Sequence, residues 1–265
     1  MTVSILGCGW YGLELAKSLV NKWVKVKGST TSADKLPGFA ASGIEPYLID
    51  LSPDNEVTDP AFFECDVLWI SIPPKARTGN GAEYLQKIER LISLTKTYQI
   101  KQVVLISSTG VYGDSNTEVT EADAPNPDGE SGKVLLAAED LLKQQTDFTT
   151  TIIRFGGLIG PNRDPGRFFA GKTDVPNGEA PVNIIHLTDC IGISNAILDK
   201  QAFGYTYNAV SPSHPTRANF YTQAAVAAGL QPPHFIEEKE SWKVVNSENV
   251  GEVLGYEYQN RLSLG

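Results

Sequence analysis

The run Val3-Ser4-Ile5-Leu6-Gly7-Cys8-Gly9-Trp10-Tyr11-Gly12 places three glycines in a G-x-G-x-x-G pattern directly after a short apolar segment. The apolar segment predicts a buried strand, and a helical pattern starts where the glycines end. The first glycine permits a tight turn, the second lets a diphosphate approach the backbone, and the third lets helix and strand pack closely. The free N–H groups and positive dipole end of the helix would then hold the diphosphate. The alternative is a glycine-rich turn without a ligand. The residues predicted to form the binding turn are Gly7, Gly9, Trp10, Tyr11 and Gly12.

Beyond this turn, short apolar runs alternate with longer helical patterns, which is typical of βαβ units in a parallel sheet covered on both faces. The expected strands are Val3–Leu6, Val24–Lys27, Pro46–Asp50, Val67–Ile72, Val103–Ser107, Thr151–Phe155, Val182–Ile185 and Tyr205–Val210. The expected helices are Gly12–Asn21, Ala82–Tyr98, Gly132–Gln145, Thr188–Asp199 and Arg217–Gly229, with Gly156–Gly178 as loop.

The predicted fold class is therefore α/β, a Rossmann-type doubly wound parallel sheet with a small C-terminal substrate-side lobe. Residues 1–160, continued by 181–203, are assigned to the NAD(P)-binding domain. Residues 204–265, with the 161–180 loop, are assigned to the lobe.

The bulk composition excludes several classes of partner. Lys and Arg number 22 against 31 Asp and Glu, a formal net charge of -9, so neither nucleic acid nor an anionic membrane is an expected partner. Three scattered cysteines suit a reducing cytoplasm, and no apolar run is long enough to span a bilayer. No signal peptide precedes the first strand, so a cytoplasmic location is predicted. The three histidines show no metal-ligand spacing, so no metal site is predicted.

The end of the second strand distinguishes two cofactors. NAD-binding chains place an acidic residue here for the ribose hydroxyls, whereas this chain has Gly28-Ser29-Thr30-Thr31-Ser32-Ala33-Asp34-Lys35. Thr30, Thr31 and Ser32 offer donors and Lys35 a positive charge to a 2′-phosphate, so NADP is favoured over NAD. Asp34 is the residue that would oppose this preference, and a helix N-cap is the alternative role for Ser32.

Other candidates lie at the carboxyl ends of later strands, where open α/β sheets hold their ligands. Asp50 and Leu51 are expected at the adenine edge, with a plain turn as the alternative for Asp50. Ile72, Pro73 and Pro74 are expected to form the wall beside the ribose and nicotinamide. Ser107 is assigned to the cofactor at the end of the fifth strand.

Four motifs in order resemble the extended short-chain dehydrogenase/reductases, the superfamily of nucleotide-sugar epimerases and dehydratases. They are Ser107-Ser108-Thr109-Gly110-Val111-Tyr112-Gly113-Asp114, the stretch from Ile153-Arg154-Phe155 to Gly160-Pro161, Val182-Asn183-Ile184-Ile185-His186-Leu187-Thr188-Asp189, and Tyr207-Asn208-Ala209-Val210. The resemblance covers nearly the whole chain. It implies an NAD(P)-dependent oxidoreductase or a nucleotide-sugar epimerase/dehydratase-like enzyme.

The chain departs from this superfamily at its catalytic pair, a Tyr with a Lys four residues later on one helix. The corresponding helix reads Glu130-Ser131-Gly132-Lys133-Val134-Leu135-Leu136-Ala137-Ala138-Glu139, and aligning it on Glu139 puts Ser131 and Leu135 at the two positions. No Tyr in the chain has a Lys four residues on. The chain therefore resembles the atypical members that keep the glycine turn and lack the pair.

Two residues are predicted to take over the chemistry. Ser108 matches the superfamily hydroxyl that polarises the substrate carbonyl, and Tyr112 is the leading substitute proton donor, with a packing role as its alternative. Arg154 is expected to meet a substrate anion or to pair with a carboxylate. Arg163 and Arg167 are candidates to clamp a phosphorylated substrate.

Two functional hypotheses remain open. The first is an NADP-linked enzyme, with NAD as the alternative cofactor, acting on a small molecule that is phosphorylated or nucleotide-linked. The second is a non-catalytic NAD(P)-binding sensor or regulatory module, suggested by the missing Tyr and Lys. The resemblance also implies a homodimer as an oligomeric state to test.

Overall fold

The computed structural model describes residues 1–54, 56–74 and 81–260. Its centre is a seven-stranded sheet in the order β10-β7-β5-β4-β1-β2-β3, with every neighbouring pair parallel. The chain starts at β1, next to the central strand β4, runs outward to the edge at β3, and then crosses over to β4 to build the other half. This order confirms the predicted Rossmann-type sheet, and it places the crevice between β1 and β4 at the switch point.

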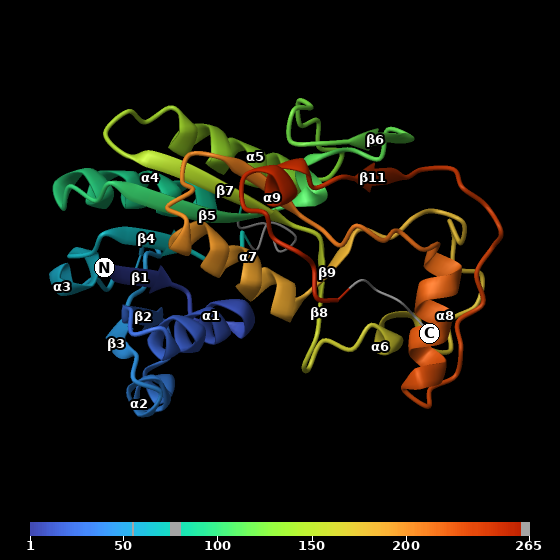
Figure 1. Ribbon diagram of the computed structural model, residues 1–265, viewed down its shortest axis with the longest axis horizontal. Coiled ribbons are helices and arrows are strands. Elements are labelled where there is room, and N and C mark those ends of the chain that lie inside the picture. The colour runs from blue at the N-terminus through green and yellow to red at the C-terminus, as the bar shows by residue number, and fades with distance from the viewer. Residues whose placement is uncertain (55, 75–80, 261–265) are drawn as a thin grey trace.

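The described strands and helices follow the predicted alternation (Figure 1). The central strands are β1 Thr2–Leu6, β2 Lys25–Thr30, β3 Glu45–Leu48, β4 Val67–Ile70, β5 Gln102–Ser108, β7 Thr149–Phe155 and β10 Thr206–Ala209. The helices are α1 Trp10–Asn21, α2 Leu36–Ala41, α3 Pro60–Phe63, α4 Gly81–Thr97, α5 Glu130–Lys143, α6 Gly166–Phe169, α7 Leu187–Asp199, α8 Arg217–Ala227 and α9 Glu248–Glu252. Short strands are β6 Thr117–Val119, β8 Gly157–Ile159, β9 Ile184–His186 and β11 Lys243–Val245.

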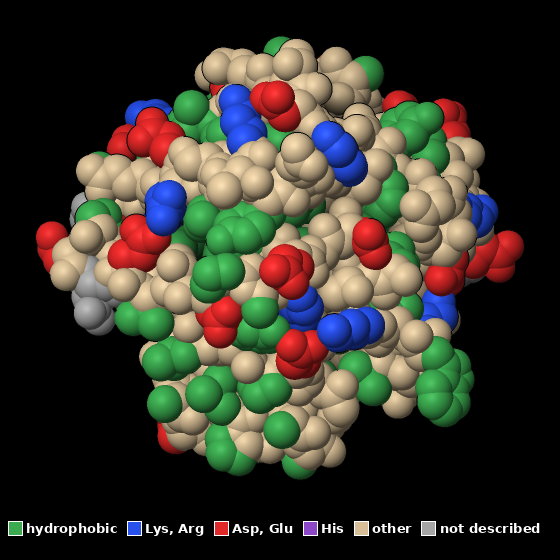
Figure 2. All heavy atoms as spheres, turned by 90° about the vertical axis from the view of Figure 1, so that its left-hand side faces the viewer, with side chains coloured by type: hydrophobic (Ala, Val, Ile, Leu, Met, Phe, Trp, Pro, Cys, Tyr) green, Lys and Arg blue, Asp and Glu red, His purple; other side chains and the backbone are tan. Residues whose placement is uncertain are grey.

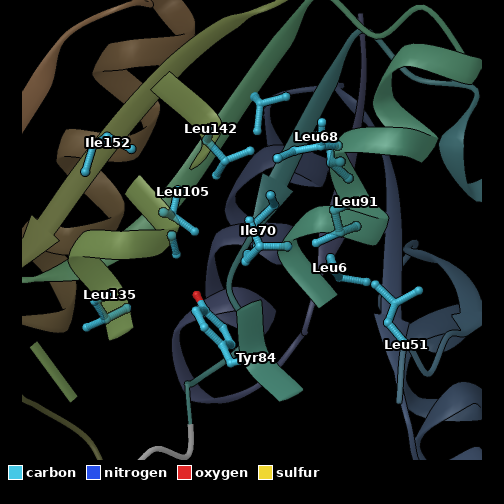
Figure 3. Packing of buried hydrophobic residues seen from close by; sticks show 14 of the residues in the cluster. Leu6, Leu51, Leu68, Ile70, Tyr84, Leu91, Leu105, Leu135, Leu142 and Ile152 are labelled. Atoms are coloured by element: carbon cyan, nitrogen blue, oxygen red, sulfur yellow. The ribbon is translucent and has the colours of Figure 1, made fainter. Parts of the chain in front are cut away.

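Two hydrophobic clusters cover the two faces of the sheet. Helices α4 and α5 pack on one face, where Leu91 and Leu142 meet strand residues such as Leu68 (Figure 3). Helices α1 and α7 pack on the other face, where Leu15 and Ile193 are fully buried. Burial on both faces explains why the central strands read as continuous apolar runs rather than alternating ones.

The substrate-side lobe differs from the prediction in two ways. The Gly156–Gly178 segment is not all loop, because β8 pairs with β9 and α6 packs against α8 at Gly166. Strand β10 belongs to the central sheet, paired with β7, although residues from 204 onward were assigned to the lobe. Short elements of this kind are set by their tertiary partners, so periodicity alone does not reveal them.

Residues 243–260 return from the lobe to the sheet, and the half-buried Asn183 and the buried Asp189 hold their backbone. The Asn183 amide pairs with Lys243 O and Val245 N, each at 2.8 Å. The Asp189 carboxylate accepts from Gln259 N at 2.7 Å and Asn260 N at 3.1 Å. We call residues 243–260 the return segment.

The face on the left of Figure 1, where the N-terminus lies, is shown in Figure 2 and intermixes acidic, basic and hydrophobic side chains. Neither sign of charge gathers there into a continuous patch. Among the described helices, none combines the length and the apolar character that crossing a membrane requires.

Candidate functional site

A cleft of about 330 Å³ opens at the carboxyl ends of β1, β2 and β4. Its size is in the range of small-molecule and cofactor sites. The predicted residues that line it are Gly7, Gly9, Thr30, Thr31, Lys35, Asp50, Leu51, Ile72, Pro73 and Pro74. Residues of four separate chain segments thus meet at one edge of the sheet.

The glycine turn has the geometry that its pattern predicts. Gly7 has a φ of +94°, which favours glycine, and its N–H donates to Ser29 Oγ at 3.0 Å. A Cβ on Gly12 would lie 2.4 Å from Gly7 O, so only glycine lets α1 pack this closely. A Cβ on Gly9 would meet nothing within 4 Å, which leaves its backbone accessible from the cleft. The N-terminus of α1 has no side-chain cap, so its amides face an approaching diphosphate.

The end of β2 presents a cation to the cleft, and the neighbouring acid faces elsewhere. Lys35 lines the cleft and also borders a second hollow, of about 710 Å³, between α1 and α2, whereas Asp34 lines the second hollow and not the cleft. No described carboxylate lies within ion-pair distance of Lys35. Asp34, the carboxylate that would oppose a 2′-phosphate, therefore lies outside the cleft.

Ser29, in the hydroxyl-rich run at the end of β2, also lines the cleft. The lining residues that sequence reasoning missed are Leu6, Cys8, Ile49, Ser52, Ser71, Glu83, Tyr84 and Lys87. Glu83, Tyr84 and Lys87 could have been predicted from their place at the start of α4. A helix that follows a parallel strand begins at the carboxyl edge of the sheet, where ligands bind. Cys8 offers a neutral thiol to this site, since burial raises its pKa to about 12.

Other predicted cofactor residues do not line the cleft. Tyr11 is buried against Phe155, and its hydroxyl pairs with Ser194 Oγ at 2.6 Å, because one step along α1 turns it towards α7. Trp10 lies beside the second hollow. Ser32 is at the N-cap of a short 3₁₀ turn without a side-chain cap bond. Gly12 acts in packing rather than as cleft lining.

Ser107 belongs to a buried hydrogen-bond network beneath the end of β5. Its hydroxyl donates to Glu139 Oε1 at 2.6 Å, and the Arg154 Nη2 donates to the other Glu139 oxygen at 2.6 Å. Glu139 is fully buried and Arg154 is 2% exposed. Of the two roles expected for Arg154, the structure shows the carboxylate pair. Ser107 is therefore not available to a cofactor through its hydroxyl.

Tyr112 belongs to the same network, which contradicts its assignment as proton donor. Its hydroxyl accepts from Arg154 Nη1 and lies within hydrogen-bond distance of Thr120 O and Asn208 Oδ1. The ring is 2% exposed, and burial, the largest influence, raises its pKa. A buried phenol with every bonding position occupied cannot exchange a proton with a substrate. The packing role that was its alternative is the correct one.

Ser108 differs from these two residues, because its side chain is partly exposed at the end of β5. Its Oγ accepts from Gly110 N at 3.1 Å, which orients the hydroxyl and leaves its own proton to donate. The next helix packs closely here, since a Cβ on Gly132 would lie 2.2 Å from Gly110 O. Ser131, at the superfamily's Tyr position, is also partly exposed.

The remaining candidates are separated by the fold. His186 is the N-cap of α7 and accepts from Thr188 N, a structural role. Lys133 is exposed and pairs with Glu130. Arg163 stacks on the Trp10 ring, whereas Arg167 points into solvent from α6, so the two do not form a clamp. Within the part of the chain that the structure describes, no three histidine, cysteine or acidic side chains gather as metal ligands would.

A family model described as NAD(P)H-binding matches residues 7–183, which include every residue that lines the cleft except Leu6. The chain belongs to this NAD(P)H-binding family. Its members bind a nicotinamide dinucleotide, and the glycine turn and cleft are the features that fit one here.

Relatives extend the assignment over the whole chain. Protein YeeZ of Escherichia coli K12 is 40% identical over 264 residues, covering 97% of this chain and 95% of YeeZ. UDP-glucuronic acid 4-epimerase of Bacillus cereus, solved with NAD, superposes with a TM-score of 0.81 at 19% identity, covering 100% of this chain and 96% of that one. A conserved protein of unknown function from Silicibacter pomeroyi gives a TM-score of 0.80 at 22% identity, covering 99% and 96%. The resemblance to the epimerase-type short-chain dehydrogenase/reductase fold is therefore confirmed, and with it the NAD(P)H-binding family's fold.

The arrangement divides into two chemical halves. The β1–β4 half offers backbone amides, an unpaired lysine and apolar walls, which suit a dinucleotide. The β5–β7 half offers the Ser108 hydroxyl, while Ser107, Tyr112 and Arg154 are bonded to one another or to Glu139. The first half can hold a cofactor, and the second can orient a substrate oxygen.

Proposed function

We propose that this protein is an NADP(H)-dependent oxidoreductase of the short-chain dehydrogenase type, acting on a small phosphorylated or nucleotide-linked substrate. The observation that carries the proposal is the cleft in which the glycine turn meets the end of β2, where Lys35 lines the cleft and Asp34 does not. The dinucleotide would supply the hydride chemistry. Ser108 would donate a hydrogen bond to the reacting substrate oxygen, and water would exchange the proton in place of Tyr112.

Lys35 supports NADP over NAD. A 2′-phosphate next to Thr30 and Thr31 would meet their hydroxyls and the Lys35 ammonium, while Asp34, the acid next to Lys35 in sequence, lies outside the cleft. Calorimetry with NADP and NAD tests this preference directly. We expect NADP to bind more tightly, and Lys35→Ala to weaken NADP by roughly tenfold while leaving NAD unchanged. Tighter binding of NAD to the unmodified protein would refute the choice of NADP.

Ser108 tests whether the protein is an enzyme. NADPH consumption would be followed across a panel of carbonyl compounds and sugar nucleotides, with the wild-type protein and Ser108→Ala. We expect turnover on part of the panel, and its loss in Ser108→Ala without loss of NADPH affinity. Absence of turnover across the panel, with NADPH binding intact, would count against an oxidoreductase.

A second function, a non-catalytic NAD(P) sensor, is favoured by one observation. The hydroxyl of Tyr112, the tyrosine that follows β5 in the chain, is withdrawn into the buried network. In a sensor, cofactor binding would alter a surface presented to a partner protein, and Ser108→Ala would leave both cofactor and partner binding unchanged.

A further inference from the structure

The loop that follows β8 lies against the first residue of α1. The Trp10 indole N–H donates to Pro161 O at 2.7 Å, and the Arg163 guanidinium carbon is 4.5 Å from the centre of the indole ring. In Figure 1 this loop, between β8 and α6, extends towards the end of α1 at the carboxyl side of the sheet. A cation from the lobe is thus attached to the residue that opens the helix.

The loop holds Arg163 in a defined position. Gly160 and Arg163 exchange two backbone hydrogen bonds, of 2.9 and 3.3 Å, and Gly160 has a φ of +143°. Asn162, between them, has a φ of +63°. The indole N–H fixes the loop backbone while the indole face holds the guanidinium, so a ligand would meet a side chain that is already largely ordered.

Arg163 is also electrostatically available. Within residues 1–54, 56–74 and 81–260, no carboxylate lies within ion-pair distance of it, whereas Arg167 lies 4.0 Å from Asp164 with its side chain 80% exposed. The Gly7–Gly12 turn itself contains no cation. Lys87, across the cleft, is paired with Glu83 at 2.6 Å. The amides of α1 alone would otherwise face two phosphate charges.

We propose that Arg163, held on the face of Trp10, contacts the pyrophosphate of the bound dinucleotide from the lobe side. The inference rests on the dinucleotide binding of the proposed function, and it adds a pyrophosphate ligand from outside the Rossmann sheet. Trp10 is the first residue of α1, so the guanidinium on its ring lies near the helix end whose amides would hold the pyrophosphate. A planar guanidinium both stacks on an indole and donates two hydrogen bonds to a phosphate, which an ammonium cannot do. The contact also couples cofactor binding to the position of the lobe.

The test compares ligands with and without a pyrophosphate. Calorimetry would measure NADP, NAD, ADP-ribose and adenosine 2′-monophosphate on wild-type protein, Arg163→Ala, Arg163→Lys and Arg167→Ala. We expect Arg163→Ala to weaken NADP, NAD and ADP-ribose by the same factor, about tenfold, and to leave adenosine 2′-monophosphate unchanged. Arg163→Lys should recover part of the loss. The loss should shrink as salt is raised, because the contact is partly exposed.

Arg167→Ala is the matched control, since it removes a neighbouring arginine that is turned to solvent, and it should bind all four ligands as the wild type does. Equal affinity of Arg163→Ala and wild type for the three pyrophosphate ligands would overturn the inference while leaving dinucleotide binding intact. An equal loss for adenosine 2′-monophosphate would also overturn it, because the effect would then be a general disturbance of the cleft. Wild-type protein that bound none of the four would overturn the proposed function, and this inference with it.

Discussion

The two halves of the sheet's carboxyl edge use polar groups in opposite ways. Between β1 and β4 the donors are backbone amides and a lysine without an ionic partner, and they face an open cleft. Between β5 and β7 the polar side chains are buried and bonded to one another, with Glu139 and Arg154 at their centre. The first half is organised for a ligand, whereas the second is organised mainly for the fold.

The difference bears on the missing Tyr–Lys pair. A helix that carried the pair would present two reactive groups to the cofactor, but the side chain through which α5 reaches the ends of β5 and β7 is the buried Glu139. The β1–β4 half keeps the features that bind a cofactor, whereas the β5–β7 half serves mainly the fold. This combination fits an enzyme with limited demands on proton transfer, or a sensor. The predictions below test this contrast.

Breaking the Arg154–Glu139 ion pair has the largest expected effect on the free energy of unfolding. Arg154→Met leaves the Glu139 carboxylate buried without its bidentate partner, and should lower the free energy of unfolding by about 3–5 kcal/mol. Urea unfolding measures it. Lys133→Met removes an exposed cation from α5, the helix that carries Glu139. Its free energy of unfolding should stay within about 0.5 kcal/mol of the wild-type value. A similar small change in Arg154→Met would show that the network is not structural.

Closing the approach to the glycine turn should affect binding and little else. Gly9→Ala adds a methyl group that meets nothing in the protein but stands where a diphosphate approaches. We expect NADP affinity to fall by about 2 kcal/mol, roughly 30-fold, with only a few tenths of a kcal/mol lost in unfolding. Calorimetry and urea unfolding measure the two effects. Gly38→Ala, also free of steric contact, should leave affinity unchanged, and unaltered NADP binding by Gly9→Ala would place the diphosphate elsewhere.

Removing the Tyr112 hydroxyl should lower stability and leave cofactor binding unchanged. Tyr112→Phe deprives Arg154 and Asn208 of a buried partner, which should cost about 1–2 kcal/mol in unfolding. NADPH affinity should remain that of the wild type, as should turnover on any substrate found. Loss of turnover at unchanged stability would restore Tyr112 as a catalytic residue and remove the contrast between the halves.

The smallest expected effect is on the pH dependence of stability, through His214 in the lobe. It tests whether polar groups of the lobe also serve the fold. His214 donates from Nδ1 to Val182 O, and burial lowers its pKa below 6.5. The folded protein binds this proton less readily than the unfolded chain does, so stability is fully present above pH 6.5 and is lost as pH falls through the folded pKa. His214→Gln should therefore flatten the decline in thermal stability below pH 6.5. Parallel pH profiles for the two proteins would contradict this.

The sheet and the cofactor half were predictable because their signals are local. The glycine pattern requires one backbone geometry, and doubly covered strands must be continuously apolar, so β1, α1 and the strand ends followed from the sequence. Strands β6 and β11 were not found, since three-residue strands depend on a partner distant in the chain. Tyr112 and Ser107 were misassigned for a related reason. Sequence gives a residue's place along a strand, but not which neighbour takes up its hydroxyl.

The return segment is held through its peptide groups and through several of its own side chains. Asn183 and Asp189 bind backbone atoms of residues 243, 245, 259 and 260, and Glu121 accepts from the amide of residue 248. Val245, Val250 and Leu254 add buried apolar anchors to these backbone contacts. Substitutions at exposed positions between the anchors, such as Glu252 and Glu257, should therefore change the surface of this stretch without loosening its attachment.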